Sequence, residues 1–212
     1  MIPQSIKLAE CAIQKYKTRD PFEIIEQRKI KLRMFTTMPT LLGYYTVVNR
    51  KQYIGINAHA NEEEQVIAAG HELGHSFLDY KTAVAGTHFE DTMAYSISNS
   101  RCEINANLFD AELLLEDEYI LELIHYDDYR RVTRYIEDHI GDYKSKKAKY
   151  DFEQEQLMNF SDSYYDMPTI SRLAAELGTD EHLVEFKLQA LSYKGYDLPN
   201  LPELKADFLR RY

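Results

Sequence analysis

The chain has 212 residues, of which 44% are hydrophobic and 28% are charged, a balance typical of globular proteins. Its net charge of -10 and pI near 5.2 argue against a general nucleic-acid or anionic-membrane binder, because such proteins need a basic surface. Cys11 and Cys102 do not make a disulfide framework, and neither a secretory signal nor an apolar run near the roughly 20 residues of a membrane span occurs. We therefore expect a soluble cytoplasmic protein with no membrane and no direct nucleic-acid partner.

The first 60 residues predict two helices followed by strands. Four apolar side chains recur at helical spacing near the start: Ile6, Ala9, Ile13 and Tyr16. A second helix is predicted where Asp20 can cap a helix that begins at Pro21. Residues 31–35 and 40–58 predict strands, and the second run is rich in β-branched and tyrosine residues. The polar "NRK" within the second run predicts a hairpin.

Helices dominate the rest of the chain. Residues 61–80 predict a helix capped by Asn61, with acidic residues in its first turn. The polar residues 81–100 predict a loop or short elements, and 101–124 predict one long second helix. Residues 125–166 are charged and tyrosine-rich, with a helical composition. Residues 167–191 predict two short helices around Gly178, which resemble a helix-turn-helix unit.

One short motif carries chemical information: "AAGHELGHSFLD", in the helix predicted over 61–80. His71 and His75 are four residues apart, so both imidazoles lie on one helix face and can reach one ion. With Glu72 they form H-E-x-x-H, the zinc-peptidase signature, in which the glutamate serves beside the metal-bound water. Gly74 would allow another element to pack closely beside the metal. The alternative is a solvated helix face that carries two unrelated histidines.

A catalytic zinc site needs a third protein ligand. Asp79 lies two turns from His71, too far along the same helix to join the pair. Three candidates fall in the poorly patterned segment that follows: His88, Glu90 and Asp91. Glu103 begins the next predicted helix and shares a face with Asn107 and Asp110. A glutamate on a second helix that crosses the first would complete a His/His/Glu set.

The two motifs together resemble the ImmA/IrrE family of zinc metallopeptidases. "HELGH" is followed by "EINANLFDAELLL", which matches the family's second motif, Glu-x-x-Ala-Asn-x-Phe. The matching residues of that motif are Glu103, Ala106, Asn107 and Phe109. The resemblance implies an α+β, zincin-like core with a small β-sheet, Zn2+ bound by His71, His75 and Glu103, and Glu72 as general base. It also implies an endopeptidase that cleaves a helix-turn-helix repressor of a prophage, mobile element or stress regulon.

On this basis we predict three segments: a zinc metallopeptidase core over 1–117, a helical insert over 118–166, and a helix-turn-helix-like segment with a tail over 167–212. The insert is longer than the family pattern leads us to expect. We do not expect the last segment to bind DNA. Its second helix carries three acidic residues, Asp180, Glu181 and Glu185, against the basic Lys187, and DNA phosphates would repel such a surface. Its leucines instead predict packing against the core or against the substrate repressor.

The sequence allows more than one role for several residues and for the protein as a whole. Tyr44, Tyr45 and His88 are candidates for stabilising the transition state, although each is also compatible with a structural role. Asn107 could support a metal ligand or bond to the local backbone. The alternative to the peptidase is a non-catalytic regulator of the same fold that binds a repressor or an antitoxin-like partner. An intact Glu72 and the lack of a clear fourth ligand favour catalysis.

Overall fold

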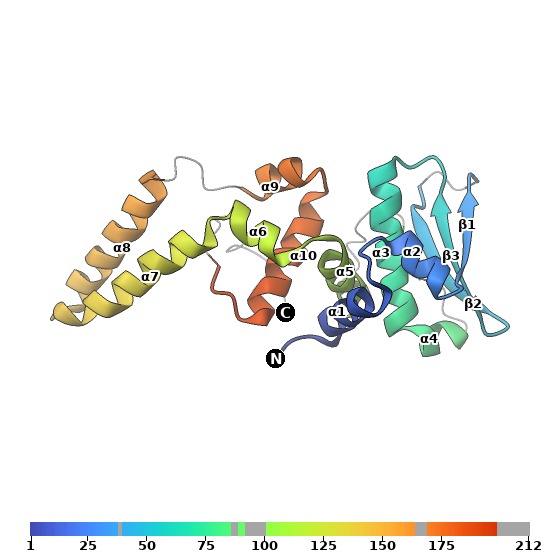
Figure 1. Cartoon of the computed structure of the whole chain (residues 1–212), viewed down its shortest axis with the longest axis horizontal. Coiled ribbons are helices and arrows are strands. Elements are labelled where there is room, and N and C mark those ends of the chain that lie inside the picture. The colour runs from blue at the N-terminus through green and yellow to red at the C-terminus, as the bar shows by residue number, and fades with distance from the viewer. Residues whose placement is uncertain (38–39, 86–88, 92–100, 164–168, 199–212) are drawn as a thin grey trace.

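A computed structural model describes residues 1–37, 40–85, 89–91, 101–163 and 169–198. The fold is mixed α+β: a small sheet lies at one end, a layer of helices lies beside it, and a two-helix arm extends at the other end (Figure 1). The strands are β1 (Lys31–Phe35), β2 (Gly43–Val48), β3 (Lys51–Asn57) and β4 (Phe89–Asp91). The helices are α1 (Gln4–Tyr16), α2 (Pro21–Gln27), α3 (Glu62–Leu78), α4 (Tyr80–Val84), α5 (Arg101–Leu114), α6 (Asp117–Leu123), α7 (Tyr126–His139), the short 3-10 helix η1 (Ile140–Asp142), α8 (Lys146–Ser163), α9 (Ile170–Leu177) and α10 (Glu181–Lys194).

The four strands form one sheet in the order β1-β3-β2-β4. The predicted hairpin is confirmed, because β2 and β3 pair antiparallel around a two-residue turn. Both turn residues, Asn49 and Arg50, have positive φ values of 51° and 62°, as the turn that suits the twist of a hairpin requires. β1 runs parallel to β3, and β4 pairs antiparallel with β2, with Gly43 opposite Asp91.

Helix α3 covers one face of the sheet and is the centre of the fold. Its predicted cap is confirmed: Asn61 Oδ1 accepts a hydrogen bond from the Glu64 amide, and the Glu64 carboxylate accepts one from the Asn61 amide. The helix packs on β2 and β3 on one side and on α5 on the other. Among the described residues, it therefore lies between two hydrophobic clusters, one against the sheet and one against the C-terminal helices.

The prediction of one continuous helix over 101–124 is wrong, because the helix is interrupted between α5 and α6. Glu116 is extended, with ψ at 136°, and the next helix begins at Asp117. Arg19 explains where α5 ends: its guanidinium donates to the backbone carbonyls of Glu112 and Leu113 at 3.0 and 2.9 Å. Carbonyls at a helix C-terminus have no partner within the helix, so a cation from elsewhere stabilises that end.

The C-terminal helix pair is confirmed, and it packs on the core. Gly178 turns the chain between α9 and α10 with a positive φ of 61°. Of the leucines predicted to pack, Leu173, Leu183 and Leu188 are buried with Phe186 in the cluster that includes α5, and Leu177 is partly buried against it. Lys187 is also fully buried, and its ammonium group donates to the carboxylates of Glu112 and Asp117. This lysine is therefore inaccessible to DNA.

The structure tests the predicted helices of residues 125–166 but does not test the predicted domain boundaries. Within residues 125–166, the predicted helical character is confirmed over the described part, where α7, η1 and α8 form the arm, and residues 164–166 lie outside the described residues. The division of the chain at residues 117 and 166 stays a prediction. In the part of the chain that the structure describes, every helix is too short or too polar to cross a bilayer.

Candidate metal centre

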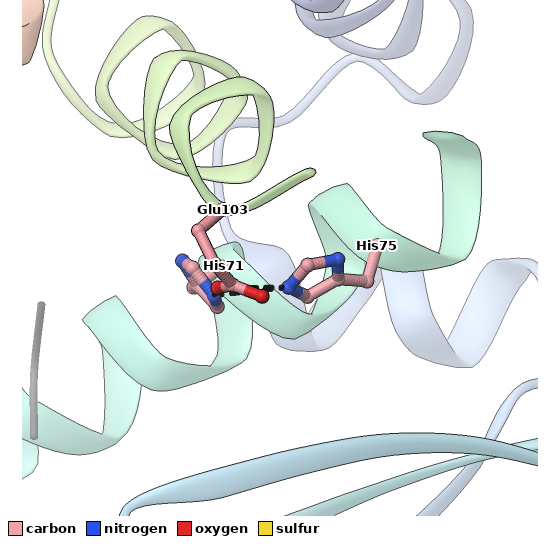
Figure 2. Close-up of side chains that lie close together, drawn as sticks. All are labelled: His71, His75 and Glu103. Atoms are coloured by element: carbon pink, nitrogen blue, oxygen red, sulfur yellow. Dashed lines mark hydrogen bonds and ion pairs between the residues drawn. The ribbon is translucent and has the colours of Figure 1, made fainter. Parts of the chain in front are cut away.

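Three potential metal ligands converge where α3 crosses α5. His71 and His75 point from successive turns of α3, and Glu103 points from the first turn of α5 toward both (Figure 2). The two Nε2 atoms are 3.1 Å apart, and Glu103 Oε2 lies 3.1 Å from His71 Nε2 and 3.4 Å from His75 Nε2. Both imidazoles are about 1% exposed, and the Glu103 side chain is 15% exposed. The residues thus form a small, mostly buried triangle of nitrogen and oxygen atoms.

Each imidazole is oriented by a partner on its other ring nitrogen. Asn107 Oδ1 lies 2.7 Å from His71 Nδ1, and Asp79 Oδ2 lies 2.8 Å from His75 Nδ1. Carboxylate and amide oxygens only accept hydrogen bonds, so both Nδ1 atoms carry the proton. When the imidazoles are neutral, the lone pairs of the two Nε2 atoms are directed at the triangle, and an Nε2 that binds a proton instead donates it to Glu103. This arrangement, in which a ligating histidine donates its other N–H to an oxygen, is usual around bound metals.

The carboxylate and the imidazoles of the cluster shift each other's pKa values. Burial raises the pKa of Glu103, but hydrogen bonds with His71 and His75 lower it by more, so the carboxyl is held well below its ordinary pKa. Burial lowers the pKa of His75, but hydrogen bonds with Asp79 and Glu103 outweigh it and raise the pKa above its ordinary value. The cluster therefore holds an anionic oxygen beside imidazoles that also attract a cation or proton.

Two glycines of α3 allow α5 to approach this closely. A Cβ at Gly74 would lie 3.2 Å from both Cα and the carbonyl oxygen of Ala106, so the backbones meet at this point. A Cβ at Gly70 would overlap the carboxylate of Asp110, which is fully buried. The expectation that Gly74 provides close packing beside the site is confirmed. Gly70 thus leaves the space that the Asp110 carboxylate occupies.

Glu72 lies on another side of α3, against the sheet. It is 1% exposed, and a Cβ at Gly43 on β2 would lie 3.0 Å from its Cγ and its Oε1. The glycine at the start of β2 therefore leaves the space that the carboxylate fills. Glu72 follows His71 directly in the helix, so the backbone that positions the first imidazole also positions this carboxylate.

The other predicted site residues are placed as follows. The ring of Tyr44 packs over Gly55, with its centroid 5.6 Å from that of Phe35. Tyr45 is fully buried beneath α3, where its hydroxyl donates to Gln52 at 2.9 Å and where burial raises its pKa. His88 lies outside the described residues, as do the side chains of Glu90 and Asp91. A role of Tyr44, Tyr45 or His88 in stabilising a transition state stays a prediction, whereas Asn107 contacts His71 directly.

Sequence reasoning missed the role of Asp79. It was considered as a ligand and set aside, yet it bonds to the imidazole of His75. The signal was available, because Asp79 follows His75 by four residues and so lies on the same helix face. Gly43 was also missed, and no local pattern marks it, since its contact with Glu72 depends on how α3 lies on the sheet.

Comparison with known proteins now adds a second line of observation. Residues 25–140, more than half of the chain, match the profile of the peptidase M78 family, described as the IrrE N-terminal-like domain. The chain belongs to this family. The match includes both helices that carry the cluster, and it confirms the resemblance derived from the motifs. The chain thus belongs to a family of metallopeptidase type and contains a His-His-Glu group that could hold a metal ion.

One curated relative of this M78-family chain comes from Bacillus phage phi105, where it is called uncharacterized immunity region protein 2. The two sequences are 34% identical over 106 residues, which cover 50% of the present chain. The aligned region spans 64% of the relative, less than two thirds of its length. No solved structure matches the chain.

Proposed function

We propose that His71, His75 and Glu103 bind one Zn2+ ion in a zincin-like peptidase core. The donor set is the kind that catalytic zinc sites use, with three protein ligands and a fourth position left open. The shape of the triangle also fits. Ligands at zinc-bond lengths on a tetrahedral ion are about 3.3 Å apart, and the three donor atoms here are separated by 3.1, 3.1 and 3.4 Å.

A zinc ion in this site would supply a Lewis acid that lowers the pKa of water to about 7 and polarises a carbonyl group. Glu72 would serve as the general base, accepting a proton from water at its carboxylate and passing it to the leaving amine. Its burial against Gly43 supports this role, because a carboxylate held in one position does not need to reorganise during the reaction. Asp79 and Asn107 would fix the imidazoles through their Nδ1–H groups.

The function supported best is that of a zinc-dependent endopeptidase that cleaves a helix-turn-helix transcriptional repressor. The convergence of His71, His75 and Glu103 carries the catalytic part of this proposal. The choice of substrate is supported by the repressor-cleaving family that the motifs resemble and by the phage relative, which is named for an immunity region.

The metal site is tested by metal analysis of the purified protein and of two variants. The wild-type chain is expected to hold one zinc ion, and His71→Ala and Glu103→Ala are expected to lose most of it. The exposed His182→Ala variant is a control that keeps the metal. Full zinc retention in Glu103→Ala would mean that the third ligand lies elsewhere in the chain.

The peptidase activity is tested on a helix-turn-helix repressor, which is chosen by searching the neighbouring genes for one that encodes such a protein. Zinc-loaded protein is expected to cut the repressor at one bond, which mass spectrometry of the products identifies. Chelation should abolish cutting, and added zinc should restore it. Stable binding of the repressor without cleavage would contradict the proposed activity and favour a non-catalytic regulator.

A further inference from the structure

The arm formed by residues 126–163 extends from the body on the side away from the sheet (Figure 1). It has a small core of its own, in which the ring of Tyr143 stacks on Phe152 at 4.6 Å and Tyr135 contacts the same ring. Ile136 and Phe152 are 6% and 8% exposed. These contacts join α7 to the start of α8, so they hold the far end of the arm in a defined shape.

One stretch of the arm, residues 130–149, which includes its far end, has a net positive charge, although acidic residues follow it in α8. Residues 130–149 contain seven lysines and arginines against three acidic residues, whereas the whole chain has a net charge of -10. Four of the basic residues lie within six positions at the end of the arm and form a lysine cluster: Lys144, Lys146, Lys147 and Lys149. Three of them are exposed, and Lys149 is half-buried.

The lysine cluster is placed at a locally unfavourable position. Three of its members lie in the first turn of α8, which contains no acidic residue. The partial positive charge at a helix N-terminus favours acidic side chains and disfavours basic ones. α3 follows the usual rule, with Glu62, Glu63 and Glu64 in its first turn. A charge pattern that opposes local stability is expected where a surface serves binding.

We propose that the lysine cluster binds the phosphate backbone of duplex DNA. Lysine is depleted at protein–protein interfaces, whereas lysine and arginine make most contacts to phosphates. Distance also shields the cluster from the acidic body. α7 has 14 residues and is therefore about 21 Å long, more than twice the Debye length of about 8 Å at physiological ionic strength. The whole-chain charge, from which we expected no nucleic-acid partner, does not show this local cluster of lysines.

The proposal does not depend on peptidase activity, so it is tested by binding alone. Fluorescence anisotropy of a labelled duplex of about 20 base pairs is titrated with the full chain at about 50 mM salt. We expect micromolar binding. Four phosphate contacts predict that affinity falls about 150-fold between about 50 and 200 mM salt. The variant with all four cluster lysines changed to Gln should bind at least about tenfold more weakly at the lower salt, and the matching change to Arg should preserve binding.

A charge-matched control separates the arm from general electrostatics. Four exposed lysines on the body, Lys7, Lys15, Lys51 and Lys81, are changed to Gln together. Binding by this variant should change by less than about twofold. An equal loss in the control and the cluster variant would overturn the proposal, as would wild-type protein that binds poly-glutamate but not DNA. The latter result would assign the cluster to an acidic protein instead.

Discussion

Replacement of Asn107 by Ala tests whether the cluster is built to hold a metal. Asn107 is 2% exposed, and its Oδ1 accepts the Nδ1 proton of His71 at 2.7 Å. Without this oxygen, the imidazole keeps a buried N–H that has lost its acceptor, which costs about 1–3 kcal/mol. The ring can recover its hydrogen bond by rotating, but its Nε2 then leaves the triangle. Loss of such a partner typically weakens metal affinity about 10- to 100-fold, which corresponds to about 1.4–2.7 kcal/mol. This range agrees with the cost of about 1–3 kcal/mol for the unpaired N–H.

The assay is competition for zinc between the protein and a chromogenic chelator at neutral pH. Asn107→Ala should bind zinc about 10- to 100-fold more weakly than the wild type. Asn107→Asp, which keeps an acceptor oxygen, should stay within about threefold or bind more tightly. Asn105→Ala removes a half-buried asparagine of the same helix and serves as the matched control. Wild-type zinc affinity in Asn107→Ala would refute the idea that this hydrogen bond orients a metal ligand.

Three further predictions follow from the packing around the site and the buried ion pairs. Gly43→Ala places a Cβ 3.0 Å from Glu72 Cγ and Oε1; metal analysis should show zinc retained while peptide hydrolysis falls about 10- to 100-fold, because the carboxylate is displaced. Lys187→Met removes one cation from buried Glu112 and half-buried Asp117 and should lower the free energy of unfolding in urea by about 3 kcal/mol, whereas exposed Lys7→Met should change it by less than about 0.5 kcal/mol. Burial raises the pKa of Asp117, but hydrogen bonds from Lys187 and Lys194 lower it below its ordinary value, so this carboxylate stabilises the fold above about pH 4. That contribution should disappear as the pH falls through the lowered pKa, and urea titrations from neutral to acidic pH should show a smaller loss in Asp117→Asn.

The part of the site that sequence could predict is the part set by local spacing. His71, Glu72 and His75 lie within five residues, and the helical repeat alone places both histidines on one face. Glu103 could be inferred only from its motif and from the family resemblance. Its distance from the histidines depends on how α5 crosses α3, which periodicity does not specify.

The parts that sequence reasoning missed depend on contacts between distant residues. The break after α5 follows from Arg19, which bonds to carbonyls more than 90 positions later in the chain. The space around Glu72 depends on Gly43, which belongs to a different element. The expectation of no nucleic-acid partner stays a prediction from the whole-chain charge, a sum that does not show where the lysine cluster lies. Local patterns thus predicted the elements, and the tertiary contacts between them were needed to complete the site.

The central claim is that this protein hydrolyses a peptide bond with Glu72 as the base. The most direct test compares the zinc-loaded wild type with zinc-loaded Glu72→Gln on the same helix-turn-helix repressor, at equal metal content. Gln keeps the size of the side chain but cannot accept the proton, so the rate of cleavage should fall by at least about 100-fold. Cleavage by Glu72→Gln at the wild-type rate would contradict the account.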